Sequence, residues 1–240
     1  AAAPARIRVV RPWIDPELFD PDRVRGYRMA GLADRWGIAP DTRLVLVPGP
    51  LAPESGHRAL LEAMAGLDRR DFTLLLLGHA EPDGAYAREL TALLRTWRLG
   101  DRVRFGGDVD DLPAALALAD VVVLPVSRPE PSGLLAAAAQ AMGKPVIVTD
   151  QGALAESVMP SATGWLVPPD DAGELGRALD LALSLDEEVR QRLAARARAY
   201  VVGTFGMQAM CERMLEIYRE LLRMTPHRHP AVAGPVAEVS

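Results

Sequence analysis

The sequence predicts an α/β protein with a doubly wound parallel sheet, a Rossmann-like arrangement that is followed by C-terminal helices. Short apolar runs of strand length alternate with longer stretches of helical periodicity, a pattern typical of βαβ units. Apart from Thr73 and Arg104, these runs are apolar at every position rather than at alternate ones, which indicates strands buried on both faces of a sheet. Right-handed crossovers between such strands produce a doubly wound domain.

The expected elements follow in order along the chain. Strands are expected at Leu44–Val47, Phe72–Leu77, Val103–Phe105, Val121–Leu124, Val146–Val148 and Trp165–Val167. Helices are expected between them at Gly56–Met64, Tyr86–Trp97, Leu112–Ala119, Gly133–Met142 and Leu154–Val158. Three more helices are expected afterwards, at Ala172–Leu183, Glu187–Val201 and Phe205–Leu222. In the last of these, five apolar side chains from Met207 to Leu221 recur at helical spacing, which predicts a packing surface.

Composition limits the classes of function. The 240 residues include 27 basic and 32 acidic ones, and this net charge of -5 argues against a nucleic-acid partner. Cys211 is the only cysteine, so we expect no intramolecular disulfide, no cysteine-based metal site and a reducing compartment. No run approaches the ~18 apolar residues of a membrane span. Residues 224–240 contain three prolines, His227 and His229 without periodicity, and we expect a mobile, solvated tail.

Ligands of an open parallel sheet bind beyond the carboxyl ends of its strands, where four loops qualify. The first loop, residues 48–56, contains neither a G-x-G-x-x-G pattern nor G-K-[ST], so it predicts neither a dinucleotide site nor a P-loop. The fourth loop leads from Val126 into a helix near Ser132 and Gly133, whose free N–H groups would suit a phosphate. An ordinary helix capped by Ser132, with Glu130 as a solvated acid, is the simpler interpretation of the same residues.

Four segments in this order resemble the C-terminal, donor-binding domain of retaining GT-B glycosyltransferases of family four, which includes bacterial polysaccharide and lipopolysaccharide sugar transferases. Val10–Phe19 is similar to P-N-G-V-D-x-x-x-F, Glu130–Leu134 to E-x-F-G-L, Gln140–Ile147 to A-M-A-x-G-x-P-V-I, and Gly164–Asp170 to G-x-L-V-P-P-G-D. The resemblance extends from Val9 to Leu222. It implies an interdomain-type segment at 1–24, a nucleotide-sugar-binding domain at 25–223 and the tail at 224–240.

The resemblance implies a nucleotide-sugar as donor substrate, with no other cofactor and no metal. It assigns donor contacts to Gly49, Gly107, Val109, Glu130, Ser132, Gly133, Leu134 and Leu135. Glu130 would contact sugar hydroxyls, the N–H groups of residues 133–135 would face the phosphate, and the backbone of Gly107–Val109 would contact the base. No catalytic base is identified in this half, so the catalytic residues are unknown.

The resemblance also implies partners. In this family an N-terminal half, which the sequence lacks, carries the acceptor site, and the acceptor would be a glycan or a lipid-linked molecule. The helix Phe205–Leu222 would pack on that half, or else form a homodimer. We expect a cytoplasmic protein of bacterial glycan or lipopolysaccharide synthesis, with a peripheral position at the inner membrane depending on the absent half.

Three positions depart from the family pattern. Pro50 and Ser55 replace an arginine and a lysine that neutralise the donor diphosphate, and Ala138 replaces a glutamate that holds the ribose. Each lost charge-assisted hydrogen bond is worth ~1.5–3 kcal/mol, so donor affinity should fall. Arg58, three residues beyond Ser55, and Arg128, two before Glu130, are donor-binding candidates that would replace the lost cations. A solvated surface position is the alternative interpretation of both arginines.

These departures leave other functions open. One alternative is a catalytically inactive domain that acts as a binding or regulatory partner. Another GT-B enzyme, such as a nucleotide-sugar epimerase, is a further alternative. A nicotinamide-dependent Rossmann enzyme is disfavoured because the glycine pattern is missing.

Overall fold

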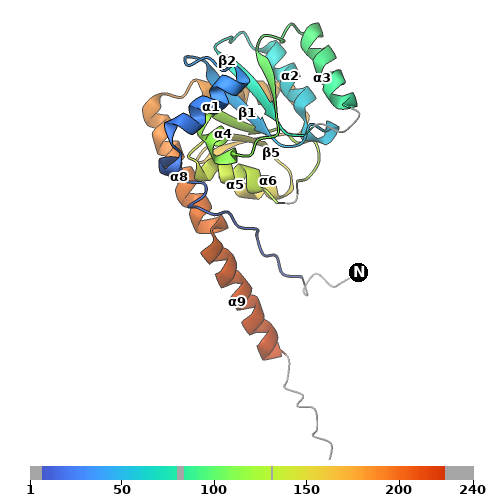
Figure 1. Ribbon diagram of the computed structural model, residues 1–240. Helices are drawn as coiled ribbons and strands as arrows, with labels where there is room; N and C mark the ends of the chain where they lie inside the picture. Colours follow the sequence, from blue (N-terminus) through green and yellow to red (C-terminus); the bar gives the residue numbers. More distant parts are fainter. Residues whose placement is uncertain (1–6, 80–83, 131, 225–240) are drawn as a thin grey trace, which may run out of the picture.

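A sheet of six parallel strands forms the centre of the computed structural model, which describes residues 7–79, 84–130 and 132–224 (Figure 1). The strands are β1 (Arg43–Pro48), β2 (Phe72–Leu77), β3 (Val103–Gly107), β4 (Val121–Leu124), β5 (Val146–Thr149) and β6 (Gly164–Val167). Their order is β3-β2-β1-β4-β5-β6, and every pair is parallel. The predicted fold class is therefore confirmed, and the order reverses between β1 and β4.

Helices cover both faces of the sheet, because successive strand residues point to opposite sides. Val45 and Val47 pack with residues of α2 (His57–Gly66), α3 (Ala85–Thr96) and α7 (Ala172–Leu183). Leu44 and Leu46 pack on the other side, which is covered by α1 (Gly26–Trp36), α4 (Leu112–Leu118), α5 (Leu134–Ala141) and α6 (Gly152–Ser157). The four inner strands, β1, β2, β4 and β5, are buried on both faces, which explains their continuous apolar runs, whereas the edge strands β3 and β6 are partly exposed.

One helix, α1, was not expected from the sequence. Its segment contains two glycines, and only Trp36 is buried, so the apolar signal is weak. One residue in the sequence does indicate where this helix ends: Gly37 adopts φ 63°, the left-handed conformation that commonly terminates a helix. The Arg28 guanidinium also ties α1 to α4 through an ion pair of 2.6 Å with Asp111.

The segment before α1 is fixed to the body of the protein. The Ile14 N–H donates to the Phe205 carbonyl oxygen over 2.8 Å, at the end of α8 (Glu187–Phe205). The Arg198 guanidinium donates to the carbonyl oxygens of Phe19 and Ala141 over 2.7 and 2.6 Å. Residues 14–19 therefore lie on α5 and α8, and a short 3-10 helix, η2 (Pro21–Arg23), leads toward α1.

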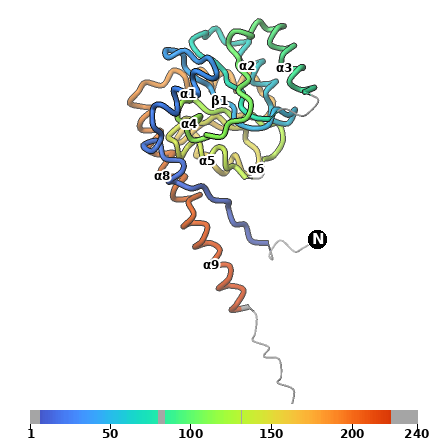
Figure 2. The backbone as a smooth tube through the Cα atoms, in the orientation of Figure 1, coloured from blue at the N-terminus to red at the C-terminus, as the bar shows by residue number. Residues whose placement is uncertain are grey.

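The last helix, α9 (Met207–Met224), extends away from the sheet and its covering helices (Figures 1 and 2). Gly206 separates it from α8 with an extended backbone, φ -70° and ψ 155°, so the chain changes direction there. Of the predicted packing surface, Met210, Met214 and Ile217 are partly buried and Met207 is half exposed, and Leu215 and Tyr218 beside it are also about half exposed. None of the helices described is both long and apolar enough to cross a bilayer. The predicted mobile tail, with His227 and His229, lies outside the described residues, apart from its first residue, which ends α9.

Candidate functional site

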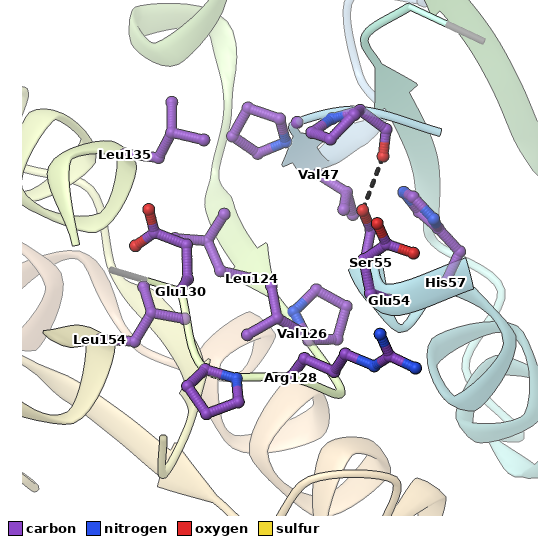
Figure 3. Close-up of a pocket in the computed structure, with 15 residues that line it drawn as sticks. Val47, Glu54, Ser55, His57, Leu124, Val126, Arg128, Glu130, Leu135 and Leu154 are labelled. Atoms are coloured by element: carbon purple, nitrogen blue, oxygen red, sulfur yellow. Dashed lines mark hydrogen bonds between the residues drawn. The ribbon is translucent and has the colours of Figure 1, made fainter. Parts of the chain in front are cut away.

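A pocket of about 240 Å³ lies beyond the carboxyl ends of β1 and β4, where the strand order reverses (Figure 3). Open parallel sheets bind ligands at this place. We call it the β1–β4 pocket. It is lined by Val47, Pro48, Gly49, Pro50, Glu54, Ser55, His57, Leu124, Pro125, Val126, Arg128, Pro129, Glu130, Leu135 and Leu154.

Glycine brings the two main walls of the pocket together. One wall is the loop after β1 with its 3-10 helix η3 (Pro53–Ser55), and the other is the loop after β4. Gly56 adopts φ 73°, and a Cβ there would lie 1.7 Å from the Pro125 carbonyl oxygen. The Ser127 N–H donates to the Glu54 carbonyl oxygen over 2.8 Å and joins the walls again. This contact allows only glycine at position 56.

The pocket wall is mainly apolar, and three of its residues carry charge. Glu54 and Arg128 are exposed at the edge, while Glu130 is partly buried. The Arg128 guanidinium makes no hydrogen bond or ion pair with any residue that the structure describes. The lining therefore has one cation for two carboxylates.

The Glu130 carboxylate is held by the turn that leads into α5. It accepts hydrogen bonds from the Ser132 N–H over 3.1 Å, from the Ser132 hydroxyl over 2.6 Å, and from the Gly133 N–H. Gly133 caps α5 with φ 64°, and the Leu134 N–H donates to the Ser132 oxygen over 3.3 Å. An internal carboxylate and hydroxyl thus already satisfy N–H groups that the sequence offered to a phosphate.

His57 is a buried residue of the pocket wall that sequence reasoning missed. It begins α2, is 1% exposed, and neither ring nitrogen has a hydrogen-bond partner of ordinary geometry among the described residues. Burial lowers the pKa of His57 to about 4, and the backbone of Ala52 opposes part of this shift. The ring of Tyr86 lies 5.9 Å away, and burial raises the pKa of its hydroxyl to about 12. His57 therefore contributes a neutral imidazole at physiological pH.

The structure brings together some of the expected residues and separates others. Gly49, Pro50, Ser55, Arg128, Glu130 and Leu135 share the β1–β4 pocket, with Ser132 and Gly133 joined to it through Glu130. Gly107, Val109 and Arg58 do not line it. The Arg58 side chain is 67% exposed and faces Glu89 at 3.7 Å.

Ala138 and Leu134 line a second, more open hollow on the outer side of α5. This α5 hollow is apolar and is completed by Leu135, Leu112 and the segment Trp13–Phe19. Ala138 is 3% exposed and packs in the core beneath it. Leu135 lines both cavities, so the α5 hollow adjoins the β1–β4 pocket. No pattern in the sequence indicated that Trp13–Phe19 would cover α5 here.

No group of three His, Cys, Asp or Glu side chains in residues 7–79, 84–130 and 132–224 is arranged to hold a metal ion.

The chain is similar to several known transferases. Alpha-D-kanosaminyltransferase of Streptomyces kanamyceticus is 31% identical over 198 residues, which are 81% of this chain and 50% of that protein. D-inositol 3-phosphate glycosyltransferase of Xylanimonas cellulosilytica is 34% identical over 226 residues, 93% of this chain and 53% of the relative. The chain thus spans about half the length of these relatives.

Solved structures share the fold. A glycosyltransferase from Rickettsia africae superposes with a TM-score of 0.87 at 24% identity, over 93% of this chain and 59% of that one. Anabaena HepE, crystallised in complex with UDP, superposes with a TM-score of 0.80 at 25% identity, over 89% of this chain and 57% of that one. The family model for glycosyl transferases group 1 matches residues 32–200, which is more than half of the chain. The chain belongs to the glycosyl transferases group 1 family.

Proposed function

We propose that the chain is the donor-binding half of a retaining glycosyltransferase that moves a sugar from a nucleotide-sugar to an acceptor. The observation that carries this proposal is the β1–β4 pocket at the reversal of strand order, with Glu130 in its lining, in a member of this family. Anabaena HepE was crystallised with UDP and with UDP-glucose, so uridine nucleotides are the first ligands to test.

Glu130 is the residue to which we assign the donor sugar. Two of its neighbours, the Ser132 hydroxyl and the Gly133 N–H, hold the carboxylate in one orientation at the pocket. A carboxylate fixed in this way accepts further hydrogen bonds from hydroxyl groups through its remaining lone pairs. We assign the nucleoside to the neighbouring α5 hollow and the loop Gly107–Val109, and this assignment needs no metal or other cofactor.

We infer that residues 25–223 form the nucleotide-sugar-binding unit and that residues 1–24 connect it to an N-terminal half. That half would carry the acceptor site, for a glycan or a lipid-linked molecule. The exposed apolar residues of α9, such as Tyr218 and Leu221, would pack on it, or on a second copy of this chain. A cytoplasmic location, with peripheral attachment to the inner membrane through the N-terminal half, fits this function in bacterial glycan synthesis.

Isothermal titration of the 240-residue chain with UDP, GDP, UDP-glucose and GDP-mannose tests the proposal. We expect millimolar or tighter binding of at least one nucleotide-sugar. Binding should weaken after Leu135→Trp, because this substitution places a bulky indole ring where the two cavities adjoin. Leu181→Trp is the matched control, because Leu181 is exposed and lines neither cavity. No binding of any nucleotide would leave the alternative of a catalytically inactive partner domain.

A further inference from the structure

The structure assigns the phosphate-binding cation of the β1–β4 pocket to Arg128, on the loop between β4 and α5, rather than to the loop after β1. This inference rests on the proposed function, because it concerns the phosphate of a nucleotide donor. It is carried by the charges on the pocket wall, by the orientation of the two neighbouring arginines, and by the hydrogen bonds at the start of α5.

The loop after β1 offers no positive charge to a phosphate. Its residues at the pocket are Gly49, Pro50 and Ser55, and the Ser55 hydroxyl already donates to the Pro50 carbonyl oxygen over 2.7 Å. The charged residue that this loop contributes to the pocket lining is Glu54, whose carboxylate repels an anion. A phosphate that leaves water for an apolar wall needs a charged partner, because desolvation of an ion is costly.

The start of α5 does not supply the missing interaction either. The N–H groups of Ser132 and Gly133 donate to the Glu130 carboxylate, and the N–H of Leu134 donates to the Ser132 oxygen. A second anion at this helix end would have to displace Glu130 and would meet its negative charge. The phosphate therefore needs a cation from another part of the wall.

Arg128 meets this need, and Arg58 does not. The Arg128 side chain lines the pocket and, in Figure 3, extends from its loop toward the side on which Glu54 and His57 lie. Its guanidinium is free of hydrogen bonds and ion pairs to the described residues. The Arg58 side chain lies outside the lining and faces Glu89 at 3.7 Å. A free guanidinium binds one phosphate through two parallel hydrogen bonds.

The test compares UDP with uridine, because their affinity ratio isolates the phosphate contribution. In the unchanged chain we expect UDP to bind at least tenfold tighter than uridine. Arg128→Gln should reduce UDP affinity by about 10-fold to 100-fold, as expected for a charge-assisted hydrogen bond, and leave uridine affinity unchanged. Arg128→Lys should restore part of the loss, because it keeps the charge without the bidentate geometry.

Arg58→Gln is the matched control. It removes an exposed arginine charge from α2, outside the pocket lining, and should preserve the ratio of UDP affinity to uridine affinity. Thermal melting of each variant verifies that the fold is intact. If Arg128→Gln keeps the preference for UDP, or Arg58→Gln removes it, the assignment to Arg128 is wrong while the proposed function stands. If the unchanged chain binds neither UDP nor any nucleotide-sugar, the proposed function and this inference are both overturned.

Discussion

Replacement of His57 by glutamine should remove much of the acid sensitivity of the fold. The imidazole is 1% exposed, and burial lowers its pKa in the folded state to about 4, from 6.5 in the unfolded chain. A buried neutral histidine contributes stability that is fully present above pH 6.5. This stability is lost as the pH falls toward 4, because only the unfolded chain then binds the proton.

The two pKa values fix the size of the effect. Between pH 8 and pH 5, protonation of the unfolded chain at His57 should lower the free energy of unfolding by about 2 kcal/mol. The limit below pH 4 is about 3 kcal/mol, from 1.36 kcal/mol for each pKa unit. These values apply to the difference between the unchanged chain and His57→Gln, in which the titration of all other groups cancels.

Urea denaturation at several pH values between 5 and 8 measures this difference. The unchanged chain should lose about 2 kcal/mol more than His57→Gln over this range, whatever the variant's stability at pH 8. Leu181→Gln is the matched control, because Leu181 is exposed on α7 and the substitution removes no titratable group, so its pH dependence should equal that of the unchanged chain. Equal pH dependence of the unchanged chain and His57→Gln would refute the claim that the fold buries a neutral imidazole.

Three further predictions concern the pocket. Glu130→Gln should strengthen UDP binding severalfold, because it removes a negative charge beside the phosphate. It should also reduce the additional affinity that the glucose of UDP-glucose contributes. Parallel titrations with UDP and UDP-glucose measure the two affinities, and an equal change in both would refute the assignment of the sugar to Glu130. Gly56→Ala should lower the free energy of unfolding by at least about 2 kcal/mol, whereas Gly203→Ala, in open space on a helix, should raise it by ~0.5–1 kcal/mol, as urea titration can show. The double variant Pro50→Arg with Ser55→Lys should raise UDP affinity at least tenfold by calorimetry, and no gain would place the phosphate elsewhere.

The sequence predicted the sheet well because the relevant forces are local or periodic. All six strands were expected within two residues of their observed limits. The continuous apolar runs of β1, β2, β4 and β5 reflect burial on both faces, and the shorter edge strands β3 and β6 were marked by brief apolar runs alone. The helix α1 escaped prediction because tertiary packing, rather than propensity, maintains its two-glycine segment. The sequence predicted that one helix ends at Val201 and the next begins at Phe205, but the observed boundary between α8 and α9 is at Gly206. The helix α8 continues to Phe205 because its end contacts Ile14 there.

The candidate site was predictable in part. Position in the sequence placed Gly49 and Glu130 at strand ends, and the sheet brings them to one pocket as any parallel sheet would. Sequence could not choose between Arg58 and Arg128, because the direction of the Arg58 side chain depends on how α2 is turned against the sheet, and that of Arg128 depends on the path of the loop after β4. It also could not show that the Glu130 carboxylate would satisfy the turn before α5, since that requires the actual geometry of three donors.

The sequence by itself determined the fold class, the alternation of strands and helices, and the family, because these follow from the order of apolar and polar residues along the chain. Only the tertiary structure decided that His57 is buried without charge, that Arg128 rather than Arg58 faces the pocket, and that Trp13–Phe19 covers α5. The burial, charge pairing and contacts of a side chain depend on groups that are distant in the sequence, and they are determined only when folding brings those groups together.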